Sequence, residues 1–196
     1  MDVSESLSQE VAKLRTSLGD LPEPVANPFL ILVSGLPGTG KSHLCRKLAQ
    51  RVPLVILESD ALRRVLSPNP CYSATESAHL FRAIHLLIEQ LLKEGVPLVL
   101  DATNLSERHR EHLYSIADRL NAKLVIVQTK AQPGLVRQRL EGRAQAPQRT
   151  DSSEPDWAVY QKMRPAEERI KRNHFVVDTS RDIETALDKI VRELER

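Results

Sequence analysis

Five short apolar runs constrain the fold of this 196-residue chain more than any other feature. They read FLILVSG, VPLVILES, VPLVLDAT, AKLVIVQT and HFVVDTS, and their apolar residues do not alternate with polar ones. Strands buried on both faces have this pattern. Helix-like segments separate the runs, at 41–51, 75–94, 107–120 and 133–141, and another follows the last run at 183–194. The alternation predicts an α/β three-layer fold, in which a five-stranded parallel sheet carries helices on both faces.

Polar residues follow directly after several of these runs. Parallel sheets bind ligands beyond the carboxyl ends of their strands, so chemistry is expected there. The residues at these ends include Glu58, Ser59 and Asp60 after the second run, and Asp101, Thr103 and Asn104 after the third. We expect Ser106 and Asp182, which precede helical segments, to be helix caps only.

The first run leads into a glycine-rich loop and then a helix, in the stretch GLPGTGKS. It fits the pattern G-x-x-x-x-G-K-[ST], whose backbone N–H groups and following helix N-terminus form a phosphate cradle. In this pattern the lysine contacts the terminal phosphates and the hydroxyl contacts Mg²⁺. We therefore predict a nucleotide site formed by Gly35, Pro37, Gly38, Thr39, Gly40, Lys41, Ser42 and His43, with His43 at its edge.

Asp101 ends the third apolar run, which would lie beside the first run in a parallel sheet. An Asp at this position is typical of the Walker B carboxylate that holds Mg²⁺ or its water. We predict that Ser42 and Asp101 bind the metal, although Asp101 could also be a strand-end cap.

Nucleotide binding alone leaves several functions open. A GTPase switch would carry N-K-x-D, and the nearest tetrad, TKAQ, lacks both the Asn and the Asp. A kinase needs a group that orients the acceptor hydroxyl. Asp60 is the candidate base, and Arg63, three residues on, would share its helix face and contact the substrate. The alternative is a capped helix with a surface Asp–Arg pair.

The segment 130–150 carries Lys130, Arg137, Arg139, Arg143 and Arg149 against Glu141 alone, a local charge of +5 − 1 = +4. Gly, Ala, Pro, Asp and Ser follow, as in a mobile flap. We predict a basic lid at about 137–155, in which Arg139 and Arg143 stabilise the transferring phosphoryl group. A solvated basic helix is the alternative. Trp157 and Tyr160 are expected to form a hydrophobic pair that anchors the helix after the lid.

Residues 1–27 form a separate N-terminal part in this interpretation, and 28–196 form the catalytic domain. Leu7, Val11, Leu14 and Leu18 are spaced as on an amphipathic helix, with Gly19 as its stop. A proline-rich connector, LPEPVANP, follows. The helix could pack against the domain edge or bind a partner.

The overall composition excludes some classes. The formal net charge is only +2, well short of a nucleic-acid coat protein. Neither Cys45 nor Cys71 belongs to a C-x-x-C pair or a disulfide framework, and the polar N-terminus does not resemble a secretory signal. No apolar run is long enough for a membrane span. We expect a cytoplasmic protein whose oligomeric state stays open.

The motifs GLPGTGKS, ESDALRR, LVLDATNLSERHR and RLEGRAQAP…DWAVYQKM together resemble the P-loop kinases of the AAA_33 type. These are related to polynucleotide 5′-kinase domains and zeta toxins, and the similarity spans about 29–196. The resemblance implies ATP and Mg²⁺ at the glycine loop, Asp60 as catalytic base, and Arg63 as a substrate-phosphate contact. It also implies that Arg139 and Arg143 form the transition-state clamp, and that Asp101, Thr103 and Asn104 flank the acceptor.

The sequence therefore predicts an ATP- and Mg²⁺-dependent kinase that phosphorylates a hydroxyl group, with Lys41, Asp60, Arg139 and Arg143 as catalytic residues. The acceptor, a small molecule or a nucleic-acid 5′ end, is left open. The alternative function is a nucleotide-dependent binding or regulatory protein with weak ATPase activity, whose N-terminal helix meets a partner.

Overall fold

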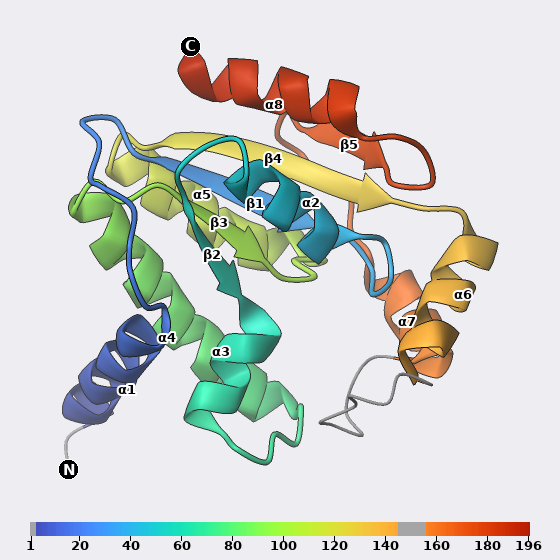
Figure 1. The fold of residues 1–196 in the computed structure, drawn as a ribbon. Coiled ribbons are helices and arrows are strands. Elements are labelled where there is room, and N and C mark those ends of the chain that lie inside the picture. The colour runs from blue at the N-terminus through green and yellow to red at the C-terminus, as the bar shows by residue number, and fades with distance from the viewer. Residues whose placement is uncertain (1–2, 145–155) are drawn as a thin grey trace.

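The computed structural model describes the backbone of residues 3–144 and 156–196, and the side chains of 5–142 and 156–196. Its centre is a five-stranded sheet with the strand order β2-β3-β1-β4-β5 (Figure 1). All four strand pairs are parallel. The strands are β1 (Phe29–Ser34), β2 (Val55–Glu58), β3 (Leu98–Asp101), β4 (Lys123–Lys130) and β5 (Phe175–Asp178). The predicted five-stranded parallel sheet is confirmed.

Helices cover both faces of the sheet, as the sequence predicts. One face carries α2 (Lys41–Ala49) and α8 (Glu184–Glu195). The other carries α1 (Val3–Ser17), α3 (Ser59–Leu66), α4 (Ala74–Lys93) and α5 (Glu107–Arg119). Beyond the carboxyl end of β4 lie α6 (Pro133–Ala144), α7 (Trp157–Met163) and the short 3₁₀ helix η1 (Arg164–Ala166), grouped at one end of the molecule in Figure 1.

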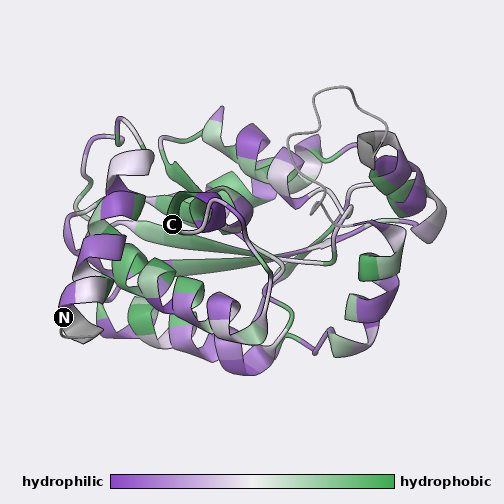
Figure 2. Ribbon diagram, turned by 90° about the horizontal axis from the view of Figure 1, so that it is seen from below, coloured by the Kyte–Doolittle hydropathy of each residue, from purple (hydrophilic) through white to green (hydrophobic). Residues whose placement is uncertain are grey.

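The strands bury both of their faces, which explains why their residues are apolar without alternation. Along β1, Leu30 and Leu32 join the core beneath α4 and α5, whereas Ile31 and Val33 join the core beneath α2 and α8. All four side chains are fully buried. Figure 2 shows hydrophobic strands flanked by helices in which hydrophobic and hydrophilic residues alternate. Burial of each such side chain contributes about 1.5–3 kcal/mol.

The N-terminal helix α1 packs on the domain itself, against α3 and α4. It buries Val11 and Leu14 in the core that α4 shares, and Arg15 forms a two-pronged ion pair with Glu94 at 2.8 and 2.6 Å. The helix ends before Gly19, whose φ of 67° is the left-handed conformation expected of a stop. Of the two alternatives for this segment, the structure shows packing within the chain.

A third, smaller core joins the glycine loop to the predicted lid. Leu36 of the loop packs with Val136 and Leu140 of α6 and with Tyr160 of α7. The rings of Trp157 and Tyr160 stack with centroids 4.8 Å apart, so the predicted anchoring pair is confirmed. Among the described residues, we find no helix with the length and apolar character needed to cross a membrane.

Candidate active site

The glycine loop lies where β1 ends and α2 begins, at the carboxyl edge of the sheet. Its backbone folds on itself, because Thr39 Oγ1 donates a hydrogen bond of 2.7 Å to the Leu36 carbonyl. Lys41 Nζ donates to the same carbonyl at 3.1 Å, so the ammonium lies over the loop. Gly40 occupies the N-cap position of α2 with φ 89°, and Lys41 and Ser42 form the first turn. The loop and the helix N-terminus thus converge as a phosphate cradle requires.

Two glycines of this loop lack a side chain for the sake of packing within the protein as well as for the approach of a ligand. A Cβ on Gly38 would lie 2.9 Å from Val136 Cγ1 of α6, and a Cβ on Gly40 would lie 2.9 Å from Thr179 Oγ1. Both residues also have positive φ, a conformation that favours glycine. Their close neighbours are the lid helix and the end of β5, so these elements hold the loop in place.

Three carboxylates meet beside the loop. Glu58 and Asp101 are paired in register on β2 and β3, and Asp60 follows in the first turn of α3. Burial raises the pKa of Glu58, and the charges of Asp101 and Asp60 raise it further. Burial also raises the pKa of Asp101, while a hydrogen bond from Ser42 and the charge of Lys41 oppose that shift. Glu58 had no predicted role, although its place at the end of an apolar run was a usable signal.

The donor set fits a magnesium ion. Asp101 is only 4% exposed, and its Oδ2 has no hydrogen-bond partner although it is buried. A buried carboxylate oxygen without a partner is costly unless a cation or water satisfies it. The Ser42 side chain forms a hydrogen bond with the Asp101 carboxylate. Hydroxyl and carboxylate oxygens are the ligands that Mg²⁺ prefers.

The loop after β3 is tied to the glycine loop through its backbone. Gly35 donates its N–H to the Thr103 carbonyl at 3.0 Å, and Asn104 Nδ2 donates to the Val33 carbonyl at 2.7 Å. Asn104 is buried and has φ 46°, whereas Thr103 is half-buried. The Asn104 amide therefore fixes the loop against β1, and the Thr103 side chain is the one of the two that is open to solvent.

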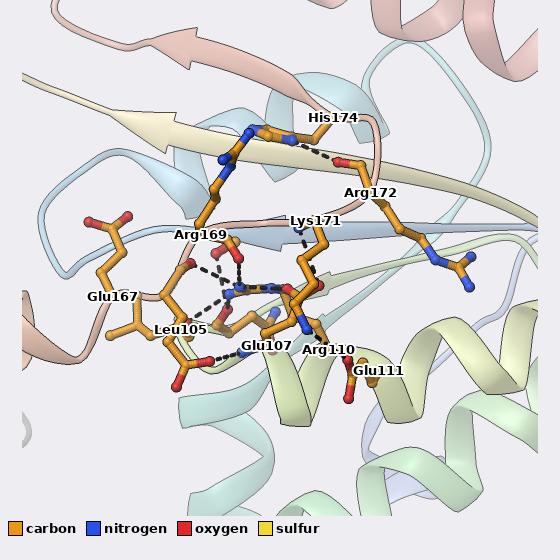
Figure 3. Close-up of polar contacts among 12 residues, drawn as sticks. Leu105, Glu107, Arg110, Glu111, Glu167, Arg169, Lys171, Arg172 and His174 are labelled. Carbon is orange, nitrogen blue, oxygen red and sulfur yellow. Dashed lines mark hydrogen bonds and ion pairs between the residues drawn. The ribbon is translucent and has the colours of Figure 1, made fainter.

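A fully buried arginine fixes the far side of this loop (Figure 3). Arg110 is 0% exposed, and its Nε donates to Glu107 Oε2 at 2.8 Å. Its other nitrogens donate to four carbonyl oxygens, those of Asn104, Leu105, Glu168 and Arg169. The guanidinium thus joins the loop after β3 to the segment that returns from η1. Arg110 is the last residue of the motif LVLDATNLSERHR, and no pattern in the sequence indicates that it is buried.

Arg139 of the predicted lid reaches the glycine loop. It donates to the Gly38 carbonyl at 3.3 Å and to Thr179 at the end of β5. Arg143 lies near the end of α6, but its side chain falls outside the described residues, as does lid segment 145–155. The structure thus places one of the two predicted clamp arginines at the site.

The remaining predicted residues differ in their surroundings. Arg63 is buried, forms an ion pair with Glu76, and stacks on Tyr72 with its guanidinium 4.7 Å from the ring centre. Hydrogen bonds from Cys71 and Arg63 lower the pKa of Glu76 to about 2. Pro37 is buried in the loop, and His43 is exposed on α2. The carboxyl edge of the sheet therefore gathers five of the predicted residues, Lys41, Ser42, Asp60, Asp101 and Arg139. Arg63 instead contacts α4.

The sheet order, the cradle at the end of β1 and the carboxylate on the adjacent β3 define the P-loop nucleotide-binding fold. The family model AAA_33, described as an AAA domain, matches residues 30–170. The chain therefore belongs to the AAA_33 family, as its motifs predicted. No protein with a curated description matches the sequence.

Solved structures with this fold include three informative examples. Kti12 from Chaetomium thermophilum, in complex with ADP-AlF3, has a TM-score of 0.67 and 18% identity, over 84% of this chain and 98% of that one. The APS kinase CysC from Mycobacterium tuberculosis, in complex with AMPPNP and APS, has a TM-score of 0.64 and 18% identity, over 89% and 100%. A gluconokinase from Sinorhizobium meliloti 1021 has a TM-score of 0.58 and 22% identity, over 85% and 89%. These similarities establish the fold.

Proposed function

We propose that this protein is an ATP- and Mg²⁺-dependent kinase that transfers the γ-phosphoryl group to a hydroxyl group. The observation that carries the proposal is the position of Asp60, beside Asp101 and Glu58 and at the same edge as Lys41 and Ser42. Asp60 stands where a carboxylate could accept the proton of an acceptor alcohol, a role that a kinase requires and that the cradle and the metal ligands do not supply. Two of the similar solved structures are named as kinases, which supports the same conclusion.

In the proposed reaction, the acceptor oxygen forms a bond to the γ-phosphorus of ATP. The bond from that phosphorus to the β–γ bridging oxygen breaks, and ADP leaves with the electron pair. Asp60 accepts the proton of the acceptor hydroxyl, Lys41 neutralises phosphate charge, and Arg139 stabilises the charge that moves between the two oxygens. Asp60 is half-buried, so substrate can reach it.

Ser42 and Asp101 would hold the magnesium ion, which supplies positive charge to the phosphate oxygens. Thr103, half-buried at the end of the β3 loop, would contact the acceptor, and Asn104 would position this loop. Arg143 would join Arg139 at the phosphates. Both cysteines are free thiols, which supports a reducing compartment such as the cytoplasm.

The alternative is a nucleotide-dependent binding protein with weak ATPase activity. This function requires the N-terminal helix to bind a partner. In the structure, α1 buries its apolar face in this chain's own core. The kinase proposal is therefore the better supported of the two.

The experiment that tests it is phosphoryl transfer from γ-labelled ATP with Mg²⁺, with Lys41→Ala as the blank. The acceptors are nucleosides, sugars, aminoglycosides, and DNA and RNA oligonucleotides with 5′-hydroxyl ends. The proposal is supported if any acceptor becomes labelled with the unmodified protein but not with the Lys41→Ala blank. Label found only in free phosphate, across all acceptor classes, would favour the binding protein instead.

A further inference from the structure

A pocket of about 360 Å³ is lined by two of the three carboxylates, Glu58 and Asp101. Its polar end contains Ser42, Glu58 and Asp101, and its apolar walls include Leu18, Leu62 and Val65. The pocket thus extends from the expected phosphate position towards the helices α1 and α3. Its volume is at the lower end of the range for small-molecule sites, roughly 300–1,000 Å³.

One wall of this pocket comes from outside the part of the chain that matches the family. Ser17 and Leu18, at the end of α1, line it, whereas the family match begins at residue 30. The wall is firmly held, because Leu14 is fully buried and the Arg15–Glu94 ion pair lies one helical turn or less from Leu18. This chain's N-terminal helix therefore determines the shape of a pocket that contains the predicted metal ligands.

The charges in the pocket select against anionic ligands. Among its described lining residues, Glu58 and Asp101 are acidic and Arg46 is the only basic side chain. Arg46 is exposed on α2, and its charge offsets only part of the charge of the two carboxylates. Arg63, the arginine that could have contacted a substrate phosphate, is held by Glu76. A polynucleotide end would bring several phosphates to a pocket whose described lining offers Arg46 as its one basic side chain.

We propose that this pocket binds the phosphoryl acceptor, and that the acceptor is a small hydroxyl compound without anionic groups, whose apolar face lies against Leu18. The proposal rests on the proposed kinase function and names its substrate class. The acceptor hydroxyl points to the end of the pocket that contains Ser42 and Asp101. There its oxygen bonds to the γ-phosphorus, the bond from that phosphorus to the β–γ bridging oxygen breaks, and ADP leaves with the electron pair. The proton passes to Asp60, which does not line the pocket itself but directly precedes the lining residue Ala61.

The test measures binding and transfer separately. Calorimetric titrations in the presence of AMPPNP and Mg²⁺ use nucleosides, uncharged sugars, aminoglycosides and a 5′-hydroxyl DNA oligonucleotide as probes. Each probe is tested on the unmodified protein, on Leu18→Trp and on Leu7→Trp. Leu7 lies on the same helix about 16 Å from Leu18 and does not line the pocket, so it is a matched control. Val65→Trp, at a position 38% exposed, fills the pocket without disturbing the core.

We expect at least one small probe to bind the unmodified protein and Leu7→Trp alike, and to bind about tenfold more weakly to Leu18→Trp and Val65→Trp. The proposal is overturned if only the oligonucleotide binds, if no small probe binds at millimolar concentration, or if neither pocket variant weakens binding. A small probe that binds in this pocket but receives no label from ATP would leave the pocket proposal standing. That result would instead count against the proposed kinase function.

Discussion

Arg139 holds Thr179 through two hydrogen bonds, one to its side-chain oxygen at 2.9 Å and one to its carbonyl at 2.8 Å. Thr179 in turn donates its hydroxyl to the Thr39 carbonyl in the glycine loop at 2.7 Å. The lid helix, the end of β5 and the glycine loop are thus joined through one threonine. Arg139 is kept at the phosphate cradle by contacts that do not require a ligand.

This arrangement predicts that Arg139→Ala lowers the turnover number of phosphoryl transfer by about 10³-fold or more, as for other arginines that stabilise transferring phosphoryl groups. Single-turnover kinetics with saturating ATP measure the effect. Arg137→Ala is the control, because Arg137 lies on the same helix but forms an ion pair with Glu141 and lies over Trp157. Equal effects of the two substitutions would show that charge alone matters here, and not the position of Arg139.

Asp60→Asn is expected to lower turnover by about 10²–10⁴-fold, because an amide cannot accept the acceptor proton. ATP affinity should change little, since Asp60 lies at the start of α3 and not in the glycine loop. Rapid-quench transfer assays and a titration with a fluorescent ATP analogue separate the two quantities. If ATP affinity falls as much as turnover, Asp60 is not the base.

Asp101→Asn should remove the response of the protein to Mg²⁺. Without the ion, the buried Asp101 carboxylate is unfavourable, so we expect the variant to be at least as stable as the unmodified protein. Mg²⁺ should raise the melting temperature of the unmodified protein in the presence of AMPPNP but not that of the variant. Calorimetric melting curves measure both. A variant that retains the full Mg²⁺ response would place the metal elsewhere.

Arg110→Met should destabilise the fold by about 3–5 kcal/mol, because it leaves the buried Glu107 carboxylate without its partner. Urea denaturation measures the free energy of unfolding. Arg172→Met is the control, since its ion pair with Asp118 is exposed and should contribute less than about 1 kcal/mol. Arg110→Lys retains a charge and should restore part of the loss. Similar losses for Arg110→Met and Arg172→Met would contradict the role assigned to the buried network.

His85 should make the protein less stable in mild acid. Its burial lowers its pKa to about 4, and the nearby His112 and His109 act in the same direction. The unfolded chain binds a proton at this residue near pH 6.5, so stability falls as the pH drops from about 6.5 to about 4, by up to about 3 kcal/mol. Urea denaturation across this range should show a smaller fall for His85→Gln. His174→Gln, at a residue away from this cluster, should retain the full pH dependence.

The sequence predicted the fold well because its signals are local. The five strands, the helix after the glycine loop and the stop at Gly19 each depend on patterns within about twenty residues. The same holds for the glycine loop, whose residues and following helix are contiguous. Such patterns also placed Asp60 and Asp101 correctly at the edge of the sheet, because parallel strands bring their ends together.

Side-chain contacts between different elements could not be predicted in this way. Asp60 and Arg63 were expected to share a helix face, but Arg63 is held by Glu76, thirteen residues further on. Ser106 stands at the N-cap of α5 without a side-chain capping bond, and Glu168 accepts the Glu107 N–H instead at 2.7 Å. In both cases a carboxylate from another segment competes with the local partner, and a single sequence holds no record of that competition.

The packing of α1 has a consequence for how the chain is made. Leu14 is buried against α4, a helix whose last residue is Lys93, so the partner surface follows the N-terminal helix by almost eighty residues. At a synthesis rate of about 5–20 residues per second, α1 would wait roughly 4–16 s on the ribosome before α4 is available. During that interval its apolar stripe lacks the cover that α4 provides in the folded protein, and α3 can cover only part of it. A nascent-chain chaperone that recognises short amphipathic helices would find a binding site in α1 during that interval.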